Sequence, residues 1–232
     1  MSFVVTPPAI VSVPVAGETD RFPVRRVYCI GRNYAAHARE MGHDPDREPP
    51  FFFCKPADAV RPVQPGQTLD LPYPPKTSDL HYEVELVVAI GKGGANIKVE
   101  DALSHVYGYA IGLDLTRRDR QQDMKDLARP WELGKAFDAS APISVIKPVD
   151  QAGDIEQAQI TLNVNGQEKQ NGHVNQMIWS IAESISYLSD YFRLEAGDMI
   201  FTGTPEGVGP VIVGDVLDGQ LEGVGSLSIK LV

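Results

Sequence analysis

The segment HYEVELVVAI, residues 81–90, combines the apolar run of a buried strand with two carboxylates, Glu83 and Glu85. Side chains alternate between the two faces of a strand, so Glu83 and Glu85 share one face, with His81 beside them. Two like charges this close resist leaving water unless they are solvated, protonated or neutralised by a cation. The segment therefore predicts a strand of a sheet whose two carboxylates face something positive.

A third carboxylate, Asp114, comes near the end of a second apolar strand, GYAIGLDLT. Carboxylate oxygens are ligands that Mg²⁺ prefers in proteins, and Mn²⁺ can use the same set. The histidines and cysteines of the sequence show no zinc-type spacing that would compete with them. The three acids could instead line a solvated face or pair with cations such as Lys135 or Arg118, and E-x-E spacing alone does not separate these alternatives.

The rest of the sequence predicts a β-rich body with few helices. Its 21 glycines and 18 prolines favour turns and irregular loops over a helical bundle. Asn165-Gly166, between two alternating runs, predicts a two-residue hairpin, and Ser180 and Glu183 have the spacing of a helix capping box. Strands outnumber helices without a regular βαβ alternation, so we expect an α+β fold with mixed or antiparallel sheets.

The polar pattern also predicts where the short helices lie. Asn33 is expected to cap a helix over residues 34–41 and Gly42 to end it, and His37 and Glu40, three apart, share one side of that helix. The other expected elements are a helix at 98–106, a helix beginning at 180, and strands at 24–31, 51–55, 81–91 and 220–232.

The length and the net charge of the chain limit its possible domain organisation and partners. A chain of 232 residues fits one large domain, and the prolines of residues 1–24 predict an extended arm ahead of a body at residues 25–232. A net charge of -10 argues against nucleic acid as a partner. The sequence has neither a basic leader nor an uninterrupted apolar run of about 18 residues, so we expect a cytoplasmic protein that does not bind membranes.

Six motifs occur in a fixed order: GRNYAAHAREMG, FFFCKPADA, HYEVELVVAIGKGG, GYAIGLDLTRRDRQ, PWELGKAFDASAPI and FTGTPEGVGP. Together they closely resemble the fumarylacetoacetate hydrolase family, most strongly its short, single-domain branch of acylpyruvases and fumarylpyruvate hydrolases. The resemblance covers nearly the whole chain after residue 24. It implies a β-rich roll of mixed sheets, like the C-terminal domain of that family, and a homodimer.

The resemblance also implies roles for individual residues. Glu83, Glu85 and Asp114 match the positions that hold a divalent cation in the family, usually Mg²⁺. The remaining matches are a catalytic dyad on a mobile helical lid (His37 and Glu40), an active-site lysine (Lys135), two residues that hold the substrate (Arg118 and Gln121) and one that binds its carboxylate (Thr204).

Each of these residues also has a plain structural interpretation. His37 could be a packed histidine, Lys135 a surface lysine paired with Asp138, and the arginines at 117–120 a solvated face. The residues alone leave both interpretations open.

The activity that the resemblance implies is metal-dependent hydrolysis of the C–C bond of a 3-acylpyruvate, a small 2-oxo acid. The most specific match is cleavage of fumarylpyruvate to fumarate and pyruvate in the catabolism of aromatic compounds such as gentisate. One alternative is oxaloacetate decarboxylation or hydroxy-acid isomerisation at the same metal site. An alternative from another class is a metal-dependent binding protein without turnover.

Overall fold

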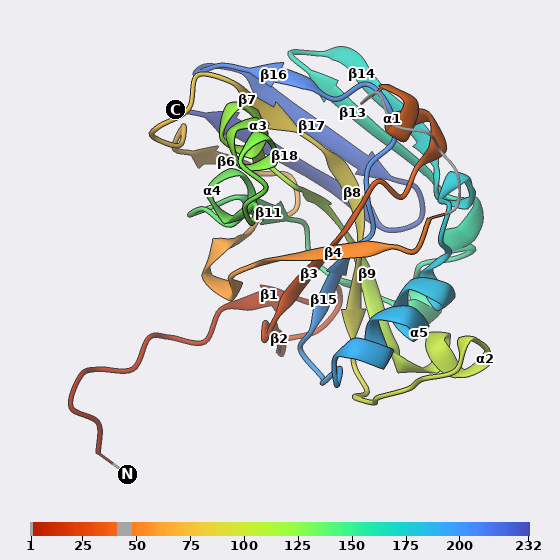
Figure 1. The fold of residues 1–232 in the computed structure, drawn as a ribbon. Helices are drawn as coiled ribbons and strands as arrows, with labels where there is room; N and C mark the ends of the chain where they lie inside the picture. Colours follow the sequence, from red (N-terminus) through yellow and green to blue (C-terminus); the bar gives the residue numbers. More distant parts are fainter. Residues whose placement is uncertain (1, 41–47) are drawn as a thin grey trace.

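The computed structural model describes residues 2–40 and 48–232, which form four β-sheets with short helices at their edges (Figure 1). The largest sheet has eight strands, ordered β4 (Phe51–Lys55), β3 (Val27–Gly31), β15 (Met199–Phe201), β8 (Val84–Ile90), β9 (Val106–Leu113), β11 (Ala141–Ile143) and β5 (Val60–Pro62), with β12 (Lys147–Pro148) paired to β9. A five-stranded sheet contains β14 (Gln167–His173), β13 (Gln159–Val164), β17 (Val216–Leu221), β18 (Gly225–Leu231) and β6 (Thr68–Leu71).

Two small sheets complete the strand inventory of the described residues. They are β10 (Thr116–Arg117), β7 (Leu80–Tyr82) and β16 (Gly209–Val211), and the hairpin β1 (Ser12–Pro14) and β2 (Arg21–Pro23). The helices are α1 (Ala35–Glu40), α2 (Val99–Ala102), α3 (Arg118–Asp126), α4 (Glu132–Lys135) and α5 (Ile181–Tyr191), with 3-10 turns η1 (Ala57–Ala59), η2 (Leu103–His105), η3 (Val149–Gln151), η4 (Ile155–Gln157) and η5 (Val174–Gln176).

Parallel and antiparallel pairs occur together, so the predicted α+β roll of mixed sheets is confirmed. Strand β15 runs parallel to β3 but antiparallel to β8, and β18 runs parallel to β6 but antiparallel to β17. None of the helices found in residues 2–40 and 48–232 is both long and apolar enough to cross a membrane.

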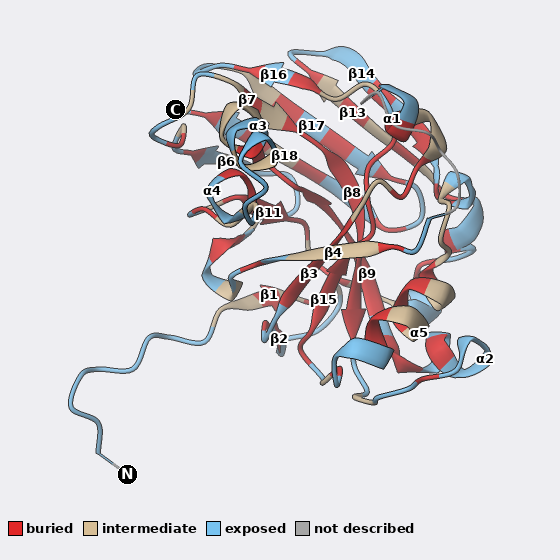
Figure 2. Ribbon diagram, viewed as in Figure 1, coloured by how far each residue is buried: buried red, intermediate tan, exposed pale blue. Residues whose placement is uncertain are grey.

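The core lies on both faces of β8, which is why that strand reads as a continuous apolar run. Leu86 and Val88 belong to the cluster between the eight-stranded and five-stranded sheets, whereas Val87 and Ala89 belong to a second cluster on the other face. Strand β8 is accordingly buried at every residue and β9 at every residue except Tyr107 (Figure 2). Glu85 is the one charged residue of β8, and it lies near the end of this doubly covered strand.

Residues 2–10 extend away from the body and are exposed, while the hairpin of β1 and β2 packs Val13 and Phe22 into the second cluster (Figure 1). The proposed boundary at residue 24 stays a prediction.

Two of the local predictions are confirmed. Asn165 and Gly166 have φ values of 52° and 76° at the turn between β13 and β14, as a type I′ hairpin requires. The capping box of Ser180 and Glu183 is present at the start of α5, with both reciprocal hydrogen bonds made.

Other local predictions need correction. The predicted strand at 81–91 is two strands, β7 and β8, interrupted at Glu83, because β7 pairs with strands of a different sheet. The helix predicted at 98–106 reduces to α2 followed by the 3-10 turn η2. Helix α1 begins at Ala35, and Asn33, predicted as its cap, instead binds Trp179 and Thr202. The predicted stop at Gly42 lies outside the described residues.

Candidate active site

The three acidic residues singled out in the sequence converge in the structure. Glu83 lies between β7 and β8, Glu85 lies in β8, and Asp114 directly follows the neighbouring strand β9. The main-chain N–H of Asp114 donates to the carbonyl of Glu83 at 2.9 Å, which holds the two strand ends together. One carboxylate oxygen from each residue lies within 4.8 Å of the others, and all three side chains are buried.

Lys135, at the end of α4, bridges two of these carboxylates. Its Nζ lies 2.9 Å from Oε2 of Glu83, 2.6 Å from Oδ2 of Asp114 and 2.6 Å from Oγ1 of Thr116. Burial alone would lower the pKa of Lys135, but Asp114 and Glu83 outweigh it and raise that pKa. The ammonium is therefore buried and charged, and the alternative of a surface lysine is wrong.

Arg118, the first residue of α3, turns into the site from a highly charged helix. It donates to Oε1 of Glu83 at 2.5 Å, to Oε1 of Gln121 at 2.7 Å and to Nδ1 of His81 at 3.4 Å. Burial raises the pKa of Glu83, but the charges of Lys135 and Arg118 bring it far below its usual range. Arg118 therefore neutralises Glu83 and orients Gln121, which is itself buried.

His81 supports this arrangement from the outer side. Its Nε2 lies 2.9 Å from Oδ1 of Asp79 while its Nδ1 faces Arg118. Burial, followed by the charge of Arg118, lowers the pKa of His81. A neutral imidazole that donates to Asp79 and accepts from Arg118 satisfies both contacts.

Lys55, at the end of β4, is a further buried cation that the sequence analysis did not single out. Its Nζ lies 2.8 Å from Oδ1 of Asp114 and donates to the carbonyls of Leu115 (3.1 Å) and Lys135 (2.5 Å). A lysine closing the apolar run FFFCK carried the same signal as the glutamates of β8, a charge inside a buried strand.

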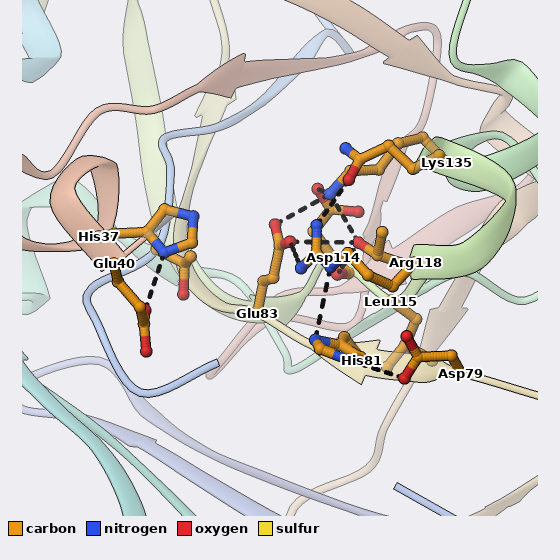
Figure 3. A network of polar contacts seen from close by, with 12 residues as sticks. His37, Glu40, Asp79, His81, Glu83, Asp114, Leu115, Arg118 and Lys135 are labelled. Carbon is orange, nitrogen blue, oxygen red and sulfur yellow. Dashed lines mark hydrogen bonds and ion pairs between the residues drawn. The ribbon is translucent and has the colours of Figure 1, made fainter. Parts of the chain in front are cut away.

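His37 and Glu40 lie together on α1, as their spacing predicted. Nδ1 of His37 is 3.3 Å from Oε2 of Glu40, and both carboxylate oxygens of Glu40 accept from the N–H of Gly207 at 3.1 Å. The pair lies on one side of Glu83, with Lys135 and Arg118 on the other (Figure 3).

The predicted site residues share one pocket of about 450 Å³, its open mouth included. Its walls hold His37, Glu83, Glu85, Asp114, Arg118, Gln121, Lys135 and Thr204, but not Glu40, which reaches the pocket only through His37. The hydroxyl of Thr204 donates to the carbonyl of Val84 and accepts from Gln170, both at 2.8 Å. Thr204 therefore anchors the loop after β15 with its side chain, so a contact of Thr204 with a carboxylate would have to come from its main chain.

The comparisons with known proteins agree with this geometry. Residues 26–232 match the family of the fumarylacetoacetate (FAA) hydrolase C-terminal domain. The chain belongs to the fumarylacetoacetate hydrolase family.

Its relatives within the family include enzymes with different names. The chain is 45% identical to the fumarylpyruvate hydrolase of a Ralstonia species over 193 residues, which cover 82% of this chain and 98% of the relative. It is 41% identical over 200 residues to a mitochondrial oxaloacetate decarboxylase of Dictyostelium discoideum, covering 86% and 90% of the two chains. The crystal structure of fumarylpyruvate hydrolase from Pseudomonas aeruginosa, in complex with Mn²⁺ and pyruvate, superposes with a TM-score of 0.98 at 57% identity, covering 100% and 99%.

The donor set of this family member fits a hard divalent cation. Of the three acids, Glu85 alone forms no ion pair with a lysine or arginine among the described residues. Its Oε2 accepts a hydrogen bond from the main-chain N–H of Gly203 at 2.8 Å. Burial, then the charges of Asp114 and Glu83, raise the pKa of Glu85 well above its ordinary value. Oδ1 of Asp114 lies beside Lys55 but accepts no hydrogen bond from the described residues. Glu85 is therefore the carboxylate whose charge a bound cation would neutralise, and the three acids together could hold a metal ion.

Proposed function

We propose that the chain is a metal-dependent hydrolase of the C–C bond of 3-acylpyruvates, with fumarylpyruvate as its substrate and fumarate and pyruvate as its products. The observation that carries the proposal is a histidine–carboxylate pair, His37 and Glu40, facing a buried cluster of three carboxylates across one pocket. The likeness to two fumarylpyruvate hydrolases supports this choice of substrate.

The metal ligands in this proposal are Glu83, Glu85 and Asp114, and Mg²⁺ is the proposed native ion. Mn²⁺ is the proposed substitute, and the Pseudomonas aeruginosa relative binds it. A bound cation would act as a Lewis acid toward the 2-oxo acid end of the substrate, where negative charge develops during cleavage.

His37 is the proposed general base. Because Glu40 accepts from Nδ1, the imidazole keeps the tautomer in which Nε2 can take a proton from water. The resulting hydroxide adds to the carbonyl carbon of the acyl group. The bond from that carbon to C3 of the pyruvate unit then breaks, its electron pair passes to the pyruvate unit as an enolate, and protonation of C3 by the imidazolium gives pyruvate.

Lys135 and Arg118 supply fixed positive charge in this scheme. Lys135 is charged and buried beside Glu83 and Asp114, so it is placed to stabilise the oxyanion that forms on the acyl carbonyl. Arg118, with Gln121 held against it, is the proposed contact for a carboxylate of the substrate. Thr204 is proposed to contribute through its main chain, because its hydroxyl is already bonded.

Oxaloacetate decarboxylation is the second candidate, and the Dictyostelium discoideum relative supports it. Both reactions pass through an enolate of pyruvate, but decarboxylation needs no attacking water. Cytoplasmic location, a homodimer and a place in aromatic catabolism remain parts of this proposal.

One assay tests the proposed function. The purified protein is incubated with fumarylpyruvate, acetylpyruvate and oxaloacetate, with Mg²⁺ or Mn²⁺ and after chelation, while the enol absorbance is followed and products are analysed. We expect metal-dependent formation of fumarate and pyruvate from fumarylpyruvate. Exclusive turnover of oxaloacetate would replace the proposal by the second candidate, and no turnover of any substrate would identify a binding protein.

A further inference from the structure

One wall of the pocket holds residues that the proposed reaction does not use. They are two cations and three aromatic side chains, which we call the aromatic-cationic wall: Arg32, Phe51, Phe53, Lys125 and Trp131. All five are half-buried and come from three separate segments of the chain.

The aromatic rings form one continuous surface that begins at the carboxylate cluster. Nζ of Lys135 lies 5.0 Å from the ring centre of Phe53, and that ring lies 5.9 Å from Trp131. Phe51 meets Trp131 edge to face at 5.3 Å. A flat, unsaturated carbon chain extending from Lys135 would therefore pack against ring faces and edges rather than water.

Each cation lies against this surface. The guanidinium carbon of Arg32 is 5.5 Å from the ring centre of Phe51, and Nζ of Lys125 is 5.4 Å from that of Trp131. Neither has an ion pair with a carboxylate within residues 2–40 and 48–232. Glu48 attracts Arg32 only through longer-range electrostatics.

Electrostatic repulsion acts between the cations of this pocket. Burial, then the charges of Arg118 and Arg32, lower the pKa of Lys125, so the cations repel one another across the pocket. Arg32 has a φ of 58°, which residues other than glycine rarely adopt. Unpaired cations in a protein of net charge -10 favour an anionic ligand.

We propose that Arg32 and Lys125 bind a second carboxylate, at the far end of the acyl group of the substrate. Phe51, Phe53 and Trp131 then pack along the flat chain between the two charged ends. The inference rests on the proposed function for the placement of the 2-oxo acid end at the carboxylate cluster. If the inference holds, the protein prefers unsaturated dicarboxylic 2-oxo acids as substrates over acylpyruvates with a neutral acyl group.

Kinetics on two substrates test the site. Lys125→Met removes one charge, and Arg32→Asn removes the other with a residue that tolerates positive φ. We expect each variant to raise KM for fumarylpyruvate by about 10- to 100-fold, which corresponds to the loss of one or two charge-assisted hydrogen bonds. The KM for acetylpyruvate should stay within about twofold of the wild-type value. Arg129→Met, an exposed cation outside the pocket, should change neither. An equal rise in KM for both substrates, or no rise in KM for fumarylpyruvate, would overturn the proposal.

A binding measurement separates this inference from the proposed function. Titration calorimetry of the Mn²⁺-loaded protein should show that Lys125→Met and Arg32→Asn lower the affinity for fumarate by about tenfold or more. The affinity for pyruvate should be unchanged. If the wild-type protein does not cleave fumarylpyruvate but shows this pattern, the function fails and the carboxylate site stands. If the protein cleaves fumarylpyruvate and the variants bind fumarate as the wild type does, the carboxylate site alone is wrong.

Discussion

Nζ of Lys55 lies 2.8 Å from Oδ1 of Asp114, and both side chains are almost fully shielded from water. Their charges come from strand ends far apart in the sequence, β4 and β9. Lys55 also donates to the carbonyls of Leu115 and Lys135. It thereby fixes the main chain on which both Asp114 and Lys135 stand.

The first prediction concerns this pair. Lys55→Met should lower the free energy of unfolding of the metal-free protein by about 3–5 kcal/mol, because it leaves a buried carboxylate with one cation fewer. Chemical denaturation measures the loss. The double variant with Asp114→Asn should lose less than the sum of the two single variants, since it removes the charge left unpaired. A Lys55→Met variant as stable as the wild type would show that Lys135 alone compensates Asp114.

The second prediction concerns pH and metal binding. Because the pKa of Glu85 is raised, the metal-free protein keeps this carboxyl group protonated at pH values above 4.5, the ordinary pKa of a glutamate. A metal ion must displace that proton, so affinity should rise with pH by up to about tenfold per unit until the folded pKa is passed. Calorimetry with Mg²⁺ or Mn²⁺ in buffers of different ionisation enthalpy should detect the released proton. An affinity independent of pH, with no proton released, would contradict this.

The raised pKa of Glu85 also determines the direction in which the stability of the metal-free protein changes with pH. A carboxyl whose folded pKa exceeds its unfolded pKa stabilises the folded state at low pH and loses that contribution as pH rises through the folded value. The stability conferred by a saturating metal ion should therefore grow over the same range of pH.

The sequence predicted the features that depend on near neighbours. The alternation around Glu83 and Glu85 placed both carboxylates on one face, and the apolar run ending at Asp114 placed a third beside them. The hairpin at Asn165-Gly166 and the capping box of α5 were equally local. In each case a few adjacent side chains determine the geometry.

Features that depend on distant strands could not be predicted in this way. The break at Glu83 exists because Tyr82 pairs with Gly209, a residue far along the chain. Helix α3 has almost no apolar residues, so its periodicity gave no signal, and Gln121 is its only buried side chain. The charge of Lys55 at the end of an apolar run marked it as unusual, but its partner Asp114 follows a strand that is distant in the sequence, so the pairing could not be predicted.

The third prediction concerns the proposed base. His37→Ala should lower kcat for fumarylpyruvate by about 10²- to 10⁴-fold, because water would lose its proton acceptor. Glu40→Gln should give a smaller loss, since it keeps the contact but weakens control of the tautomer. His173→Ala serves as the control, because His173 is exposed and is not among the residues that line the pocket. If His37→Ala retains full turnover of the native substrate, no attacking water is activated there and decarboxylation is favoured.

The last prediction concerns Gly207, whose N–H holds both oxygens of Glu40. Its φ is 92°, and a Cβ there would lie 2.1 Å from the carbonyl oxygen of Lys169, so Gly207→Ala must displace the loop. Gly214→Ala is the matched control, because Gly214 has a φ of 99° but open space around it. Both variants should lose about 1 kcal/mol of stability from backbone strain, and Gly207→Ala should lose more because of its steric clash with Lys169, as measured by thermal unfolding. Only Gly207→Ala should also lower kcat, since only that loop supports Glu40 and, through it, His37; equal kcat in the two variants would show that Glu40 keeps its position without the loop.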